Sequence, residues 1–488
     1  MRYWKDFIAF QKIESQGITT KIKRGTHQGA RLKVIIRIAE HKVTLLELKK
    51  NLPPCRASEF KRIQKMSIKK INSPEPSDPQ KTALYFIVLM GIVSLFGDVT
   101  YEGARSITGP YLAMLGASAG VVGLVAGTGE FIGYALRLVS GWLSDRTKAY
   151  WPITITGYGL LIFIPCLAFA GFWQAAAVFI ILERMGKGIR TPARDTILSH
   201  ATKQVGRGFG FGLHEALDQI GAIIGPLIFS LVFLFKGGYK QGFTILWIPA
   251  LLCIAILLIA RKKVPSPEKL ETCDDIKSRK DMLDTGKSRK FSRVFWLYAL
   301  FTFLTVAGFT NFQIISYHFK VQGVISDRLI PIFYAVAMGV DALMALIIGR
   351  IYDRVGLISL ITIPVLTIPI PFLAFSHSFN LAVMSAILWG AVMGIHETIM
   401  RAAIADLTYL ENRGTAYGIF NTIYGAGWFI GSTAMGLLYD FSIHYLIMFV
   451  ILMEVISIPI FFLTLMSITG RPKQGGNENT REKDADNA

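Results

Sequence analysis

The sequence predicts an all-α integral membrane protein with about twelve transmembrane helices, arranged as two six-helix bundles that are related by a parallel repeat. Three observations lead to this fold class. Of the 488 residues, 52% are hydrophobic and only 17% are charged, whereas soluble domains carry about 25% charged residues. Long apolar stretches recur along the chain, and the second half of the sequence repeats motifs of the first half.

The apolar stretches are long enough to cross the hydrocarbon core, which takes about 20 residues of helix. Helix is expected because a backbone in lipid must satisfy its own hydrogen bonds. The predicted spans of the first half are 83–112, 119–143, 151–170, 174–195, 209–235 and 242–260. The predicted spans of the second half are 294–317, 329–351, 357–376, 380–400, 415–438 and 443–467.

Polar segments divide the chain around these two bundles. The predicted domains are a basic tail at 1–80, a first bundle at 81–262, a cytoplasmic linker at 263–292, a second bundle at 293–468 and a tail at 469–488 with a disordered composition. Met66 stands just before a short polar lead into the first span. We therefore interpret residues 1–65 as a gene-model extension that the protein does not need.

The basic residues are distributed as in a membrane protein. Residues 1–65 hold 16 Lys and Arg against five Asp and Glu, so they carry +11 of the net charge of +19. Loops after the even-numbered spans are also basic, and the segment 261–293 holds 11 Lys and Arg. Positive loops mark the cytoplasmic side, which predicts a cell-membrane protein with both termini in the cytoplasm. No zinc-finger or base-stacking pattern accompanies the charge, so no nucleic-acid partner is expected.

A short motif occurs in both halves, 208 residues apart. It combines a glycine with an Asp-Arg pair and is predicted to lie in the loops after the second and eighth spans. Its members are Gly141, Asp145 and Arg146 in the first copy, and Gly349, Asp353 and Arg354 in the second. Glycines of the fifth span also return in the eleventh, at an offset of 206. Parallel repeats of this kind place a substrate site at the interface between the halves.

The first copy, Gly-x-Leu-Ser-Asp-Arg, resembles the loop motif of the major facilitator superfamily, Gly-x-Leu-Ala/Ser-Asp-Arg-x-Gly-Arg/Lys-Arg/Lys. The match stops at Lys148, where the motif has glycine, and Ala149 and Tyr150 replace basic residues. The resemblance implies a transporter whose acid–base pairs lock a cytoplasmic gate without binding substrate. The residues expected at this gate are Gly141, Asp145, Arg146, Arg194, Gly349, Asp353, Arg354 and Arg401.

The fifth span carries Gly212, Gly221, Gly225 and Pro226. This spacing resembles the antiporter motif of drug–proton exporters, Gly-x8-Gly-x3-Gly-Pro-x2-Gly-Gly, although its closing glycine pair is missing. Small residues let helix backbones approach closely, and proline bends a helix. The resemblance covers about residues 81–468 and implies proton-coupled efflux by alternating access.

Charged residues inside the predicted spans are the evidence for function that does not depend on a resemblance. An ionisable group in the bilayer costs at least ~2.5–3.5 kcal/mol, so each needs a partner or a purpose. Asp98, Glu102 and Arg105 share one face of the first span. Arg184 and Gly188 resemble the superfamily's Arg-x-x-x-Gly motif, which is associated with proton coupling. The proton-coupling candidates are Asp98, Glu102, Arg105, Glu130, Glu183, Arg184, Glu215 and Asp218.

The second half has fewer buried charges, so we expect it to form more of the substrate surface. The substrate-pathway candidates are Arg137, His214, Asn311, Gln313, Asp341, His396 and Glu397. We expect a monomer that binds a small-molecule substrate, protons and the lipid bilayer. No nucleophile–base pair, metal cluster or phosphate loop appears in the sequence, so no enzyme activity, metal or cofactor is expected.

Two other functions stay open. A proton-driven uptake symporter would use Arg105, Arg137 and Arg184 to bind an organic anion, but the partial antiporter motif favours efflux. A membrane sensor that does not transport would use the same fold. It would need a large signalling domain, for which the polar tails are short.

Overall fold

The computed structural model describes residues 79–267, 291–408 and 413–469. The secondary structure in these ranges is helical, without a β-strand, which confirms the predicted all-α fold class. The proposed start at Met66, with the rest of the basic tail, lies outside the described residues, as do most of the linker and the C-terminal tail.

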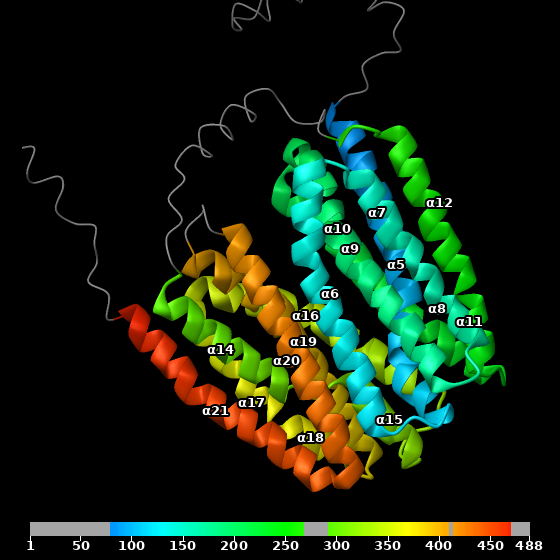
Figure 1. Ribbon diagram of the computed structural model, residues 1–488, viewed down its shortest axis with the longest axis vertical. Coiled ribbons are helices and arrows are strands. Elements are labelled where there is room, and N and C mark those ends of the chain that lie inside the picture. The colour runs from blue at the N-terminus through cyan, green and yellow to red at the C-terminus, as the bar shows by residue number, and fades with distance from the viewer. Residues whose placement is uncertain (1–78, 268–290, 409–412, 470–488) are drawn as a thin grey trace, which may run out of the picture. The chain divides into compact units, whose positions relative to one another are not determined.

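The helices of the two halves follow one another in the predicted order (Figure 1). The first half consists of α5 (Pro79–Met114), α6 (Ala119–Thr147), α7 (Tyr150–Gly159), η2 (Leu160–Ile162), α8 (Phe163–Cys166), η3 (Leu167–Phe169), α9 (Trp173–Val205), α10 (Arg207–Leu234), α11 (Tyr239–Ile245) and α12 (Trp247–Lys263). The second half consists of α14 (Arg293–Gly308), α15 (Phe312–Val321), α16 (Ile330–Val355), η5 (Gly356–Ile361), α17 (Thr362–Thr367), α18 (Pro369–Ala374), α19 (Phe379–Leu407), α20 (Arg413–Phe441) and α21 (Ile443–Thr469).

Nine helical stretches in the described residues are long and apolar enough to cross a membrane. One of them, Ile330–Ala374, has 45 residues, which is about twice the length that one span needs. Gly356, with a φ of 64°, turns the backbone inside this stretch. α9 and α20 are not among the nine, because charged or small polar residues lower their hydropathy. The count of twelve spans therefore stays a prediction.

Four of the predicted spans, the third, sixth, seventh and ninth, consist of consecutive helices, and the breaks in the sixth and seventh have a local cause. The sixth is divided at Leu246 into α11 and α12, three residues before Pro249, whose ring nitrogen cannot donate to the preceding turn. The seventh is divided into α14 and α15 by three residues that are not helical. Asn311 caps α15, because its side-chain oxygen accepts a 3.0 Å hydrogen bond from the Gln313 backbone N–H.

The loop predicted between residues 195 and 209 is absent, and this prediction was wrong. α9 continues to Val205 and α10 begins at Arg207, so a single residue joins them. That residue is Gly206, whose φ of 99° suits glycine alone. The predicted helix ended too early because it was drawn from the apolar residues alone, and a helix that emerges from the membrane can continue with polar residues.

Close contacts between helix backbones repeat in the two halves. In the first half, a Cβ placed on Gly221 would lie 2.4 Å from the carbonyl oxygen of Leu95. One placed on Gly225 would lie 2.4 Å from the carbonyl oxygen of Val99. Glycine at these positions therefore lets α10 approach α5 closely, as the sequence predicted.

The second half repeats this contact between α20 and α14. A Cβ on Gly427 would lie 3.0 Å from the carbonyl oxygen of Phe303, and one on Gly431 would lie 2.3 Å from that of Ala307. Each of these glycines lies 206 residues after its counterpart in the first half, Gly221 or Gly225. Each carbonyl that it contacts lies 208 residues after the corresponding carbonyl of Leu95 or Val99. The parallel repeat predicted from the sequence is thus present in the packing.

The two halves each bury a hydrophobic core, and α6 packs along α20 between them (Figure 1). Large apolar side chains remain exposed on α12 and α21, including Leu251, Ile259, Met448 and Leu452. An exposed apolar surface of this extent suits lipid and not water.

Candidate functional site: a charged cavity between the two halves

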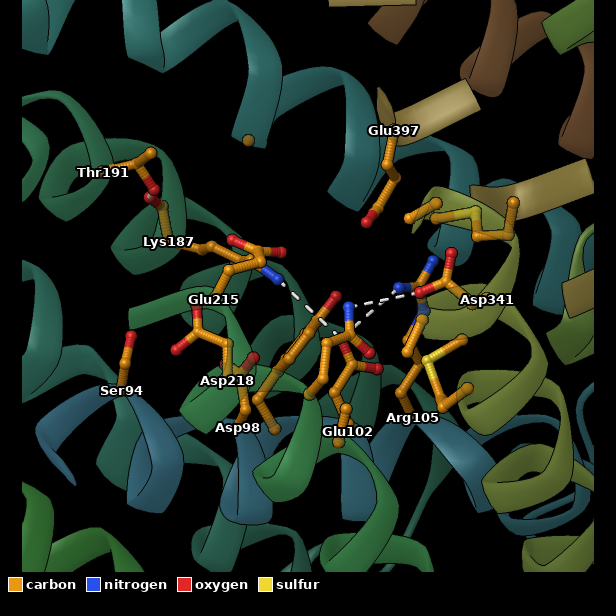
Figure 2. A pocket seen from close by; sticks show the side chains of 18 of the residues that line it. Ser94, Asp98, Glu102, Arg105, Lys187, Thr191, Glu215, Asp218, Asp341 and Glu397 are labelled. Atoms are coloured by element: carbon orange, nitrogen blue, oxygen red, sulfur yellow. Dashed lines mark hydrogen bonds and ion pairs between the residues drawn. The ribbon is translucent and has the colours of Figure 1, made fainter. Parts of the chain in front are cut away.

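A cavity of about 710 Å³ lies among the helices that carry most of the predicted charged residues (Figure 2). Its walls come from α5, α6, α7, α9 and α10 of the first half and from α16, α19 and α20 of the second. This volume lies within the usual range of small-molecule sites. The charged lining residues are Asp98, Glu102, Glu130, Asp195, Glu215, Asp218, Asp341, Glu397, Arg105, Arg137, Arg184, Lys187, Arg190 and Arg194.

Glu102 on α5 connects the two walls of the cavity. Its carboxylate lies 3.7 Å from the guanidinium of Arg105 and 3.8 Å from the ammonium of Lys187 on α9. From the other half, the hydroxyl of Tyr334 on α16 donates a 2.6 Å hydrogen bond to Glu102 Oε2. Glu102 and Tyr334 are both buried, and a hydrogen bond to a carboxylate is stronger than one between neutral groups. A proton bound at Glu102 would therefore alter contacts within its own half and across the interface.

A second buried carboxylate, Glu130 on α6, bridges two arginines. Its Oε1 lies 3.1 Å from Arg105 Nη2 and 3.2 Å from Arg184 Nη1. Behind Arg184, the buried Glu183 lies 3.7 Å from Arg190 and does not line the cavity. Removing one partner of a buried ion pair costs about 3–5 kcal/mol, because the other charge is left uncompensated. These pairs therefore tie α5, α6 and α9 together as well as placing charge at the cavity wall.

Tyr101 on α5 holds two of the cations in place. The ammonium of Lys187 lies 4.0 Å from the centre of the Tyr101 ring, and the guanidinium of Arg184 lies 4.4 Å from it. Both distances are within the range of a cation–π interaction. The Lys187 side chain remains 28% exposed, and Figure 2 shows it reaching toward Glu102.

Arg194 lies in the cavity wall, although the sequence grouped it with the gate. Its guanidinium is 2.9 Å from Asp195, 3.9 Å from Asp218 on α10, and donates a 3.1 Å hydrogen bond to Ser94 on α5. His214 lies one turn from Asp218, with its Nδ1 3.7 Å from that carboxylate. This group therefore links α5, α9 and α10 at one side of the cavity.

The second half contributes only acidic charges to the cavity lining within the described ranges, namely Asp341 on α16 and Glu397 on α19. The side-chain amide of Gln219 on α10 donates a 3.2 Å hydrogen bond to Asp341. This is a second polar contact between a carboxylate in the cavity and the opposite half. The cations that line the described cavity all belong to the first half.

The structure brings together most, but not all, of the predicted site residues. Seven of the eight proton-coupling candidates line the cavity, and Glu183 is the exception. Among the substrate-pathway candidates, Arg137, Asp341 and Glu397 line it. The candidates that do not line it are His214, Asn311, Gln313 and His396.

Two of these outliers have structural roles. Asn311 caps α15 and donates a 3.1 Å hydrogen bond to the Ser432 hydroxyl. The ring of His396 is buried and stacks on Phe309 at 5.3 Å. Polarity within an apolar span was the signal that selected both residues, and it does not distinguish capping from ligand binding.

The repeated Gly-x-x-x-Asp-Arg motif lies on helices, and its predicted loop placement was wrong. Its residues belong to the ends of α6 and α16: Gly141, Asp145, Arg146, Gly349, Asp353 and Arg354. The backbone leaves the helix only at Lys148, with a φ of 56°, and at Gly356, with a φ of 64°. Asp145 and Asp353 are exposed. The side chain of Arg401 lies outside the described residues.

The halves meet at the end of the molecule where α5 is followed by α6. Asp440 on α20 accepts hydrogen bonds of 3.0 Å from the Ala119 N–H and 2.8 Å from the Gly120 N–H. These N–H groups belong to the first turn of α6, where helical partners are lacking and the helix dipole favours a negative charge. The carboxylate of one half therefore caps a helix of the other.

The cavity is accessible from the opposite end, where α6 is followed by α7. Two of its lining residues on that side, Asp195 and Leu346, are 45% and 62% exposed. The lining residues deeper inside, such as Tyr101 and Glu102, are buried. One end of the cavity is thus open while contacts between the halves close the other.

Sequence reasoning missed the uncharged partners of the cavity carboxylates. Tyr334 and Gln219 carry no formal charge, and Tyr101 is one of many aromatic residues, so no pattern singled them out. Glu454 was also missed, although an acidic residue in one of the two most apolar spans was a signal that could have found it. Within the described ranges, no group of three or more His, Cys, Asp or Glu side chains is placed to hold a metal ion.

Apolar helices that can cross a membrane, arranged around a polar cavity that is open at one end, define a membrane transporter. The family model described as Major Facilitator Superfamily matches residues 84–432 and 326–486. The chain belongs to the major facilitator superfamily.

Known proteins resemble the chain in sequence and fold. It is 41% identical over 386 residues to an uncharacterized protein of Mycobacterium tuberculosis, covering 79% of this chain and 94% of that one. It is 28% identical over 369 residues to an uncharacterized MFS-type transporter of Methanocaldococcus jannaschii, covering 73% and 89%. The crystal structure of the nucleoside transporter NupG matches with a TM-score of 0.59 and 14% identity, covering 79% of this chain and 100% of that one. This last likeness shows the fold alone.

Proposed function

We propose that this transporter is a proton-coupled exporter that works by alternating access, with Glu102 and Asp98 as the coupling carboxylates. The observation that carries the proposal is the hydrogen bond from Tyr334 to Glu102, because it ties a buried carboxylate of one half to the other half. A proton on Glu102 removes its charge. This weakens its attraction to Arg105 and Lys187 and its hydrogen bond to Tyr334. The protonated and deprotonated chains then favour different arrangements of the halves.

Asp98 supports this role because it lies one turn from Glu102 on α5 and lines the same cavity. Two carboxylates at this spacing repel one another, and sharing a proton relieves the repulsion. Because the charge of each carboxylate acts on the other, we assign the coupling to the pair and not to one residue.

Efflux is the direction that the α10 glycines favour. Gly212, Gly221, Gly225 and Pro226 resemble the antiporter motif, and the last two glycines lie against the α5 backbone beside Asp98. A proton-coupled uptake symporter for an organic anion is the second candidate. The partly exposed ammonium of Lys187 in the cavity favours it.

The experiment that tests the proposal measures proton movement and solute movement in the same proteoliposomes. A growth screen of a strain that lacks the protein, against a broad panel of toxic compounds, selects candidate solutes. Each selected solute is then added to proteoliposomes that contain the full chain and a pH-sensitive dye, with an acidic lumen. An exporter makes the lumen more alkaline as the solute enters, compared with liposomes without protein. Solute entry without proton movement contradicts proton coupling, and lumen acidification indicates symport.

The remaining assignments follow from the loops and the repeat. We infer that both termini lie in the cytoplasm, because the positive loops follow the even-numbered spans, and that the chain resides in the cell membrane as a monomer. The open end of the cavity would then face the cytoplasm.

We also infer bundles at 81–262 and 293–468, and a cytoplasmic gate formed with Asp145 and Asp353. Asp145→Asn should slow turnover and leave substrate affinity nearly unchanged, since the side chain is outside the cavity.

A further inference from the structure

Glu454 is a buried carboxylate that the central cavity does not explain. It is the one acidic residue of α21, it is fully buried, and it does not line the cavity. Neither of its carboxylate oxygens has a hydrogen-bond partner among the described residues. An ionised carboxylate without partners is costly in a membrane protein, so an acidic residue at such a position needs a purpose.

The carboxylate lies against the point where the seventh span breaks. A Cβ placed on Gly308, the last residue of α14, would lie 2.7 Å from Glu454 Oε1. The next three residues are not helical, and the N–H of Phe309 bonds to the carbonyl of Val306 in a tightened turn at 3.3 Å. Backbone groups at a helix end lack helical partners. In transporters, such breaks inside the membrane provide groups that bind ions.

The opposite side of the break packs on α19. The Phe309 ring stacks on Trp389 at 5.5 Å and on His396 at 5.3 Å, and the Trp389 indole donates a 2.9 Å hydrogen bond to the Thr310 carbonyl. His396 is therefore the other titratable group beside the break. α14, α17, α18, α20 and η5 pack against α21. No described side chain on these elements forms an ion pair or hydrogen bond with Glu454.

We propose that Glu454 is a proton-binding site outside the central cavity, and that its protonation sets the conformation of the break between α14 and α15. The neutral acid can donate a hydrogen bond to a carbonyl oxygen that the break has freed. The carboxylate cannot donate, and instead attracts N–H groups and water. The two protonation states therefore favour two backbone arrangements of the seventh span. The proton is exchanged with solvent water, and no other bond changes.

This site goes beyond the proposed function, because it requires neither Glu102 nor Asp98. Its first test uses the purified full chain in lipid nanodiscs without any substrate. Infrared difference spectra between alkaline and acidic pH should contain the carbonyl stretch of one protonated carboxylic acid that Glu454→Gln lacks. Identical difference spectra for the wild type and this variant would overturn the proposal.

The second test asks whether this proton controls the break. Amide hydrogen exchange of residues 308–312 is compared at one alkaline pH for the wild type, Glu454→Gln and the control Thr464→Val, which alters a buried residue further along α21. Glutamine mimics the neutral acid, so exchange at the break should differ from the wild type by roughly tenfold or more. The control should follow the wild type. Equal exchange in all three proteins would overturn the proposal. If Glu454→Gln does not fold, Glu454→Met takes its place; methionine also cannot ionise, so exchange at the break should again differ from the wild type.

Discussion

The hydroxyl of Tyr334 and the carboxylate of Glu102 join the two halves of the transporter through a 2.6 Å hydrogen bond at the inner end of the central cavity. Glu102 also lies within 4 Å of two cations of its own half. The charge of the Glu102 carboxylate therefore affects both the contact between α5 and α9 and the contact between the two halves. This double role is the physical basis of the coupling that we propose.

Removing the tyrosine hydroxyl should weaken the closed end of the cavity. Hydrogen bonds to charged groups contribute about 1.5–3 kcal/mol, so Tyr334→Phe should shift the equilibrium by that amount toward the arrangement in which this closed end opens. The measurement is the distance distribution between spin labels at Met114 and Val321, two exposed positions near the closed end. The control is Tyr445→Phe on the exposed face of α21. A distribution identical to the wild type would show that the bond does not hold the halves.

Asp440 should act as a latch at the same end. Asp440→Asn removes the negative charge that caps α6, and capping and dipole interactions are worth about 0.5–2 kcal/mol. The same pair of spin labels should report a larger fraction of long distances. Ser442→Ala, which alters a partly exposed neighbour, serves as the control. If Asp440→Asn leaves the distances unchanged, the contact with α6 does not contribute to closure.

The repeated glycine contacts should be equally intolerant of a methyl group in both halves. Gly225→Ala and Gly431→Ala each force a Cβ against a backbone carbonyl oxygen, 2.4 Å and 2.3 Å away. Overpacking of this kind costs about 1–3 kcal/mol, so the thermal midpoint in detergent should fall in both variants. Gly339→Ala is the matched control on α16, because no atom lies within 4 Å of its Cβ position. Stability that falls in one half only would contradict an equivalent role in the repeat.

The protein should be less stable with lysine at position 148, at the end of α6, than with glycine there. The φ of 56° at this position is unfavourable for a residue with a side chain, and the equivalent position 208 residues later is Gly356. Lys148→Gly should raise the free energy of unfolding by about 1 kcal/mol or less, since glycine also loses more backbone entropy. Thr147→Gly, at a helical position next to it, should lower the stability instead. A loss of stability in Lys148→Gly would show that the lysine side chain matters more than the backbone.

Much of the fold was predictable because lipid imposes simple rules on a sequence. Apolar length predicted the helices, and the repeat of Gly221 and Gly225 in the second half predicted packing that the structure contains. Helix ends were predicted poorly. The stretch around Gly206 shows why, since hydropathy reports where the membrane ends and not where the hydrogen-bonded helix ends.

The candidate site was predictable only in part. The charges of Asp98, Glu102 and Glu130 on shared helix faces indicated one polar centre, and the structure places them around one cavity. The contacts that connect the halves depend on Tyr334 and Gln219, which are neutral and come from distant parts of the chain. Such contacts follow from three-dimensional packing, and one sequence without its fold does not contain a signal for them.

The most direct measurement compares gradient-driven transport with substrate exchange in proteoliposomes that contain the wild type, Glu102→Gln or Asp98→Asn. The neutral side chains cannot release a proton, so both variants should lose accumulation driven by a pH gradient by about tenfold or more. Both should retain counterflow exchange, which needs no proton movement. Asp98 lies nearer the middle of the first span than Glu102 does. Because Glu102 also bonds to Tyr334, we nevertheless expect Glu102→Gln to lose as much accumulation as Asp98→Asn, or more. Gradient-driven accumulation at the wild-type level in both variants would contradict the claim that these carboxylates couple protons to transport.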